Sequence, residues 1–222
     1  MYIPNKYLEE EWEQSEDIIN RYPLGTVITH SADGIIANHI PFYVHIDENT
    51  GKKYLRAHLA KANHQLPALK SGDKVCVVFQ SANSYITPSW YANKKVTHKF
   101  VPTWDFAAVH IYGTPTIIDD YQFVRDQITK LTDLAEAYRE DKWKVTDAPE
   151  SYTNIMQKAI TGLEIEIETV QCKYKFEQGM KTEDYNGVQC GLAEENKDEV
   201  SDFVGCANAR YCAKREAKKL AA

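Results

Sequence analysis

The segment 57–64 carries polar side chains at a point where a predicted strand turns into a predicted helix. His58, Lys61 and Asn63 lie in it, and Arg56 directly precedes it. A strand-to-helix corner presents free backbone N–H groups and the positive end of a helix dipole, which together favour an anion such as a phosphate. The segment is not a glycine-rich phosphate loop, so a purely structural role stays open beside anion binding.

A second polar pair lies in the predicted strand 35–44. Asn38 and His39 are neighbours there, so they point to opposite faces of the strand. Both side chains donate and accept hydrogen bonds, as the edge of a heterocyclic ligand requires. A histidine or asparagine with a structural role is the alternative.

The third cluster is aromatic and spans residues 81–106. Its large rings are Tyr85, Trp90, Tyr91, Phe100 and Trp104. Flat rings bury a large area against a planar ligand and stack on it specifically. The same rings also suit a barrel end or a dimer interface, where aromatic residues are enriched, and the residues alone do not decide between these roles.

The elements that must position these clusters are mainly strands. Hydrophobic patterning predicts strands over 24–30, 35–44 and 53–59 as a three-strand meander, with Asp33-Gly34 forming a tight turn between the first two. Further strands are predicted over 74–80, 105–118 with an interruption at 113–115, 163–168, and 173–178 paired with the strand before it. Helices are predicted from Asn5 or Leu8 to Arg21, over 60–69 and 121–138, and after Pro149 with Tyr152, Ile155 and Met156 facing inward.

Composition and missing motifs exclude several classes of protein. The chain has 222 residues and a net charge of −6, the wrong sign for a protein that must neutralise many phosphates, so direct DNA binding is not expected. The N-terminus has no secretory pattern and no window approaches about 18 apolar residues, so we expect a cytoplasmic protein without a membrane segment. Five cysteines without a Cys-x-x-Cys pair, and histidines without a His-x-x-x-His pair, predict reduced thiols and no metal site. Rossmann dehydrogenases, common serine hydrolases and P-loop NTPases lack their motifs here.

Beyond residue 193 the composition becomes charged, and we expect a terminal helix or a mobile tail over 193–222. An acidic block precedes a basic one formed by Arg210, Lys214, Arg215, Lys218 and Lys219. Such charge runs are typical of a solvated face.

In their order along the chain, these clusters resemble the PaiB family of FMN-binding negative transcriptional regulators. The resemblance covers about residues 1–192. The similar segments are 1–4, 23–29, 37–42, 60–63, 85–91, 101–104, 108–113, 160–165 and 173–176.

The resemblance implies a mixed β and α fold, a split β-barrel of the pyridoxamine-phosphate-oxidase-like type with peripheral helices. It also implies a homodimer with FMN between the subunits. Asn38 and His39 would then line the isoalloxazine ring, and His58, Lys61 and Asn63 would hold the ribityl phosphate. Trp90 and Trp104 would border the ring, and Lys175 with Gln178 would reach it from the partner chain.

Three segments depart from the family pattern, at residues 63–66, 105–106 and 177–179. Asp105 places a carboxylate where relatives carry an amide, and we expect its negative charge to oppose an anionic cofactor. Three functions remain open at this point: a flavin-bound regulator, a flavin-dependent oxidoreductase in which the flavin does the redox chemistry, and a haem or tetrapyrrole binder. No residue demands the role of a catalytic acid or base.

Overall fold

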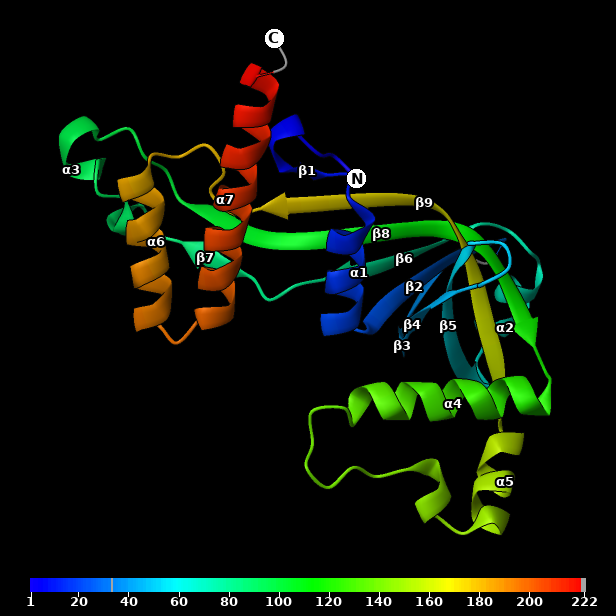
Figure 1. Ribbon diagram of the computed structural model, residues 1–222. Helices are drawn as coiled ribbons and strands as arrows, with labels where there is room; N and C mark the ends of the chain where they lie inside the picture. Colours follow the sequence, from blue (N-terminus) through cyan, green and yellow to red (C-terminus); the bar gives the residue numbers. More distant parts are fainter. Residues whose placement is uncertain (33, 221–222) are drawn as a thin grey trace. The chain divides into compact units, whose positions relative to one another are not determined.

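The computed structural model describes residues 1–32 and 34–220, and the chain forms two compact units (Figure 1). One comprises residues 15–79 and 109–170 and is called the barrel unit below. The other, the terminal unit, comprises residues 1–14, 80–108 and 171–222. The long strands β8 (Thr103–Ile118) and β9 (Ile160–Lys175) contribute residues to both.

An antiparallel sheet forms the barrel unit, with the strand order β3-β2-β6-β8-β9-β5-β4. Its remaining strands are β2 (Leu24–Ser31), β3 (Gly34–Pro41), β4 (Tyr43–Ile46), β5 (Lys53–Ala60) and β6 (Val75–Gln80). Alternate residues of these strands point inward, as the period of two predicts. The fully buried core side chains include Val27, Leu55, Val77, Phe79, Ile111, Leu163 and Ile165. Each contributes about 1.5–3 kcal/mol to folding by leaving water.

The helices of the barrel unit are α1 (Trp12–Arg21), α2 (Leu66–Lys70), α4 (Tyr121–Ala135) and α5 (Glu150–Lys158), with the short turn η3 (Val145–Asp147). Helix α4 begins where the Asp120 side chain accepts the Phe123 N–H at 2.8 Å, an N-cap that satisfies one free donor of the first turn. On the outer face of β5, α4 lies over Arg56, whose guanidinium is 5.1 Å from the Phe123 ring centre.

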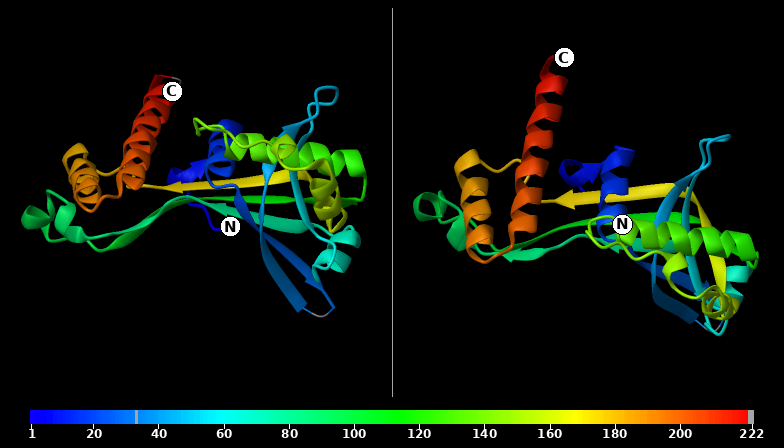
Figure 2. Two further views of the ribbon diagram at one scale, coloured as in Figure 1. Left: turned by 90° about the horizontal axis from the view of Figure 1, so that it is seen from below. Right: turned by 60° about the horizontal axis from the view of Figure 1, so that its bottom comes forward.

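The terminal unit is built from both ends of the chain and the segment 80–108. Its elements are η1 (Asn5–Tyr7), β1 (Leu8–Glu9), β7 (Ser84–Ile86), η2 (Pro88–Trp90), α3 (Lys94–Thr97), α6 (Thr182–Glu194) and α7 (Asp198–Leu220). Strand β1 pairs with β9 at Leu8↔Lys173, and β7 pairs with β8 at Tyr85↔Trp104. Helices α6 and α7 lie side by side in Figures 1 and 2, joined by hydrogen bonds between Gln189 and Ser201.

Helix α7 spans Asp198–Leu220 within the charged C-terminal segment. Its apolar residues Phe203, Val204 and Ala207 are buried, so one stripe of a mostly charged sequence faces the core. The rings of Phe176 and Phe203 stack with centres 5.0 Å apart. The boundary at residues 192–193 stays a prediction.

Several predicted elements differ from the observed ones. The predicted meander is wrong: the run 35–44 divides at Phe42 into β3, which pairs with β2 in the hairpin visible in Figure 2, and β4, which pairs with β5. Asp33 of the predicted turn lies outside the described residues. The predicted strand 163–168 and the first part of the predicted strand 173–178 belong to one strand, β9, because no glycine or proline separates them, and β9 ends at Lys175.

Strand β8 is not interrupted at 113–115 either. A Cβ on Gly113 would lie 1.9 Å from the Glu166 carbonyl oxygen, so this glycine permits close approach of two strands and does not end one. The first helix begins at Trp12, since Leu8 and Glu9 pair as a strand. Helix α5 turns Tyr152, Ile155 and Met156 outward, against the prediction.

All five cysteines are free thiols. Within residues 1–32 and 34–220, no helix combines the length and the apolar character needed to cross a membrane.

Candidate functional site

In the barrel unit, three amide side chains form one hydrogen-bonded cluster. Asn38 Nδ2 donates to Gln65 Oε1 at 2.9 Å and to Asn63 Oδ1 at 3.4 Å. Gln65 is fully buried, and its backbone N–H donates to Asn63 Oδ1 at 2.9 Å. The Gln65 Nε2 group donates to three further oxygens on β2 and β3: Val27 O, Thr29 Oγ1 and Ile36 O.

This cluster fixes two predicted site residues beside each other. The cluster uses the Nδ2 group of Asn38 as donor and the Oδ1 atom of Asn63 as acceptor. The other polar atoms of these two side chains, Asn38 Oδ1 and Asn63 Nδ2, take no part in the hydrogen bonds of the cluster. Both side chains are half-buried. An acceptor and a donor held next to each other match the alternating edge of a heterocycle. His39 is exposed on the other face of β3, opposite Thr26 of β2.

His58 lies on the outer face of β5, under α4. Its Nδ1 is 2.6 Å from Gln127 Oε1. Because an amide oxygen only accepts, Nδ1 carries the proton in this arrangement. The Gln127 Nε2 group is buried without a hydrogen-bond partner among the described residues, which leaves an unmet donor beside His58.

The corner at residues 60–66 differs from the predicted one. Helix α2 begins only at Leu66, next to Pro67, which suits the first turn of a helix. The Lys61 N–H donates to Ala159 O and the Asn63 N–H to Ala60 O, so turn and strand bonds take these donors. The predicted array of free N–H groups is therefore wrong, and any anion here depends on side chains.

Lys61 keeps a cation at this corner. Its Nζ is 2.7 Å from Asp119 Oδ1, and these side chains are 42% and 67% exposed. An exposed pair of this kind contributes only about 0–1 kcal/mol. Lys61 can therefore exchange Asp119 for a stronger anionic partner.

In the terminal unit, three ionisable residues lie around a buried acid. Asp105 is fully buried, and both its oxygens lack a hydrogen-bond partner within the described part of the chain. Lys175 Nζ lies 3.8 Å from Asp105 Oδ1, and Tyr91 donates its hydroxyl to Glu177 Oε2 at 2.9 Å. Burial, followed by the negative charge of Glu177, raises the pKa of Asp105 to about 9.

Asp105 is therefore protonated at neutral pH. The negative charge expected there from the sequence is absent, and with it the expected repulsion of an anionic cofactor. Burial also lowers the pKa of Lys175 and raises that of Tyr91.

Trp104 and Lys175 lie together beside this acid. Lys175 Nζ donates to the Trp104 carbonyl oxygen and to Thr103 Oγ1. Trp104 is 52% exposed, yet its Nε1 donates to Asn83 Oδ1 at 2.9 Å. Its ring also packs edge to face with the Tyr85 ring, with the two ring centres 6.3 Å apart. An exposed ring held in place in this way is a ready contact surface for a flat ligand or another chain.

The last two predicted residues are held within their own unit. The Trp90 ring covers α6 so closely that a Cβ on Gly191 would come within 2.3 Å of it. Gln178 closes the turn after β9: its Oε1 accepts the Phe176 N–H and its Nε2 donates to Tyr174 O.

Comparisons with known proteins show which family the chain belongs to. A family model described as "Putative FMN-binding domain" matches residues 1–169. The chain belongs to this family. The uncharacterized protein YKL070W of Saccharomyces cerevisiae is 39% identical over 171 residues, 68% of this chain and 100% of that protein. The Bacillus subtilis protease synthase and sporulation protein PAI 2, a PaiB protein, is 27% identical over 85% of this chain and 87% of its own length.

A solved structure supports the fold of this FMN-binding family member. The FAD and heme binding protein of Mycobacterium smegmatis has a TM-score of 0.59 with 17% identity, over 83% of this chain and 80% of that one. The predicted fold is confirmed: this is a PaiB-like split β-barrel with peripheral helices.

The sequence does not reveal the residues that position the site. Gln65 lies in a segment that departs from the family pattern, yet it anchors both asparagines. Nothing in the sequence places Gln127 beside His58. No local pattern marks Gln65, which follows His64 and precedes Leu66, although a buried amide must find several partners.

Proposed function

We propose that this protein binds FMN and works as a flavin-loaded homodimer of the PaiB type, a regulator that acts without reading DNA itself. The observation that carries the proposal is the amide cluster, in which Gln65 fixes Asn38 and Asn63. A site whose polar atoms are held before the ligand arrives loses little entropy on binding.

Asn38 Oδ1 would accept from the N–H of the isoalloxazine edge, and Asn63 Nδ2 would donate to a neighbouring ring acceptor. His39 points to the opposite, exposed face of β3, so it would not share the ring edge that Asn38 binds. Trp90 and Trp104 would contribute apolar ring area from the terminal unit of the partner chain, and Lys175 and Gln178 would reach the ring from that chain as well.

The phosphate would be held by His58 and Lys61. A charged hydrogen bond to phosphate contributes about 1.5–3 kcal/mol, more than the 0–1 kcal/mol of the exposed Lys61–Asp119 pair it replaces. Gln127 Oε1 accepts the His58 Nδ1–H and so keeps the imidazole ring oriented. These residues fit the cofactor, and bound FMN would supply a redox-sensitive ring whose state the protein reports.

Regulation would be indirect because the net charge of −6 opposes contact with the DNA backbone. The cytoplasm is the compartment we propose, since the protein would respond to metabolites there.

An absorption spectrum with a titration tests cofactor binding. We expect added FMN to give flavin bands and to quench tryptophan fluorescence with saturation at one FMN per chain. Asn38→Ala should weaken binding by about 0.5–1.5 kcal/mol, the contribution of one hydrogen bond. The matched control is Asn49→Ala in the exposed turn before β5, which should bind as the wild type does. A Soret band with haem and no response to FMN would replace this proposal with tetrapyrrole binding.

Two further measurements separate the remaining parts of the proposal. Light scattering after gel filtration should give a dimer mass, and a monomer that binds FMN fully would refute the shared site. Reduced nicotinamide should leave the flavin absorbance unchanged over minutes. Rapid bleaching would show an oxidoreductase in place of a regulator.

A further inference from the structure

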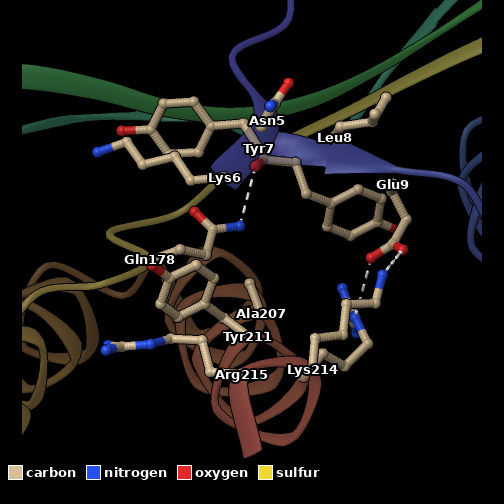
Figure 3. A pocket seen from close by; sticks show the side chains of 12 residues that line it. Asn5, Lys6, Tyr7, Leu8, Glu9, Gln178, Ala207, Tyr211, Lys214 and Arg215 are labelled. Carbon is tan, nitrogen blue, oxygen red and sulfur yellow. Dashed lines mark hydrogen bonds and ion pairs between the residues drawn. The ribbon is translucent and has the colours of Figure 1, made fainter. Parts of the chain in front are cut away.

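The terminal unit contains a pocket that shares only Gln178 with the residues of the proposed flavin site. It encloses about 100 Å³ between the N-terminal segment and α7. Its walls are polar and aromatic: Asn5, Lys6, Tyr7, Leu8, Glu9, Tyr174, Gln178, Ala207, Arg210, Tyr211, Lys214 and Arg215 (Figure 3). The residues of α7 lie beyond the part of the chain that the family model matches.

Four cations and one carboxylate line this pocket. Glu9 is 7% exposed and lies 2.5 Å from Lys214 Nζ and 3.4 Å from Arg210 Nε. Figure 3 shows Glu9 and Lys214 on one side, with Lys6 and Arg215 pointing to the opposite side. Glu11 Oε1 also comes within 4.0 Å of Lys214 Nζ, so two carboxylates face four cations and positive charge remains in surplus.

Arg210 has hydrogen-bonding capacity that the protein does not use. Its Nε and Nη2 atoms are buried without a hydrogen-bond partner among the described residues, although Nε lies 3.4 Å from Glu9 Oε2. The guanidinium also lies 4.9 Å from the centre of the Tyr174 ring, which holds it in one orientation. Buried donors without acceptors carry a desolvation cost that a bound anion would remove.

We propose that this pocket binds the phosphate group of a small anionic effector, at a site separate from the flavin. The planar fork of Arg210 suits two phosphate oxygens, and Lys6 and Arg215 add charge from the facing side. A phosphate ester carries about −1.5 to −2 at neutral pH, which matches the surplus of positive charge in the pocket better than a single carboxylate does. The pocket volume of about 100 Å³ leaves room for a phosphate group.

Calorimetric titration of the full chain at low salt tests phosphate binding in the pocket. Inorganic pyrophosphate and glycerol phosphate are the two probes. We expect saturable binding by at least one of them. Tighter binding of glycerol phosphate would identify an ester as the effector, and tighter binding of pyrophosphate a free polyphosphate. Arg210→Gln should raise the Kd about tenfold, and Arg215→Gln, at an exposed position that does not disturb folding, about threefold.

Lys219→Gln is the matched control, since Lys219 is an exposed cation of α7 outside the pocket. Equal affinity in Arg215→Gln, Lys219→Gln and the wild type would overturn the proposal, as would no heat from either probe at millimolar concentration. FMN titrations of the same variants separate the two sites. Loss of FMN and pyrophosphate binding together would make this pocket the phosphate end of the flavin site and refute a separate one.

Discussion

The buried acid Asp105 makes the stability of this protein depend on pH in a way that one substitution isolates. Asp105→Asn replaces a protonated carboxyl group with an amide of the same shape, so the packing of β8 is retained. The amide does not titrate. The stability of the variant therefore does not depend on the free energy of protonating a buried acid.

The magnitude follows from the pKa. The pKa of an aspartate is 3.8 in the unfolded chain and about 9 for Asp105 in the fold. A raised pKa favours folding below pH 3.8, and this contribution is lost as the pH rises toward about 9. Between about pH 5 and pH 7 the unfolded state releases the proton that the folded state keeps, at about 1.4 kcal/mol per pH unit. The stability advantage of Asp105→Asn should thus grow by about 3 kcal/mol over these two units.

Urea denaturation at both pH values, followed by fluorescence, measures this difference. Asp133→Asn, on the exposed side of α4, is the control and should follow the wild-type pH profile. A difference between Asp105→Asn and wild type that is the same at both pH values would refute a protonated Asp105. If Asp105 is neutral, the FMN affinity of Asp105→Asn at neutral pH should also lie within about threefold of the wild-type affinity. The carboxyl group and the amide are then both uncharged, and a threefold change in affinity corresponds to about 0.6 kcal/mol.

Three more substitutions test the positions that the structure assigns. Gln65→Leu should cost about 3 kcal/mol in urea denaturation, because several buried partners lose their bonds together; a loss under 1 kcal/mol would show that they find other partners. Gly191→Ala should cost about 1–3 kcal/mol and change the fluorescence of Trp90, since the new Cβ meets the indole, whereas Gly205→Ala meets only the flexible end of a glutamine and should cost less. Lys61→Ala should weaken FMN binding by about 1.5–3 kcal/mol in a titration, and unchanged affinity would remove Lys61 from the site.

The fold was predictable where local pattern and tertiary structure agree. The strand at 74–80 and the helix after Asp120 appear close to their predicted bounds, because an apolar run and a capped amphipathic stripe are local signals. The predicted meander is wrong at Phe42, since the pairing of β4 depends on which strands close the sheet and not on its own residues. The predicted strand interruption at Gly113 is wrong for the same reason. Whether a glycine ends a strand or permits the close approach of another strand depends on that other strand.

The site shows the same division between residue type and partner. The sequence indicated Asn38 and Asn63 as polar ligand contacts, and the structure places them together. It could not indicate that Lys61 faces Asp119 or that the corner N–H groups are taken by Ala159 and Ala60, because these partners are distant in sequence or set by the turn.

Gln65 shows most clearly how a residue's role depends on its partners in the fold. A glutamine at this position departs from the family pattern, and on sequence grounds it weakens the case for a site. In the fold it is fully buried and joins β2, β3 and Asn63, so the departure supplies the rigidity that a preformed site needs. If this is its role, Gln65→Glu should impair FMN binding more than Asn38→Ala does, because a carboxylate cannot donate to the Val27 and Ile36 carbonyl groups that hold the cluster. Weaker impairment than in Asn38→Ala would mean that Gln65 supports the barrel alone and that the asparagines bind without it.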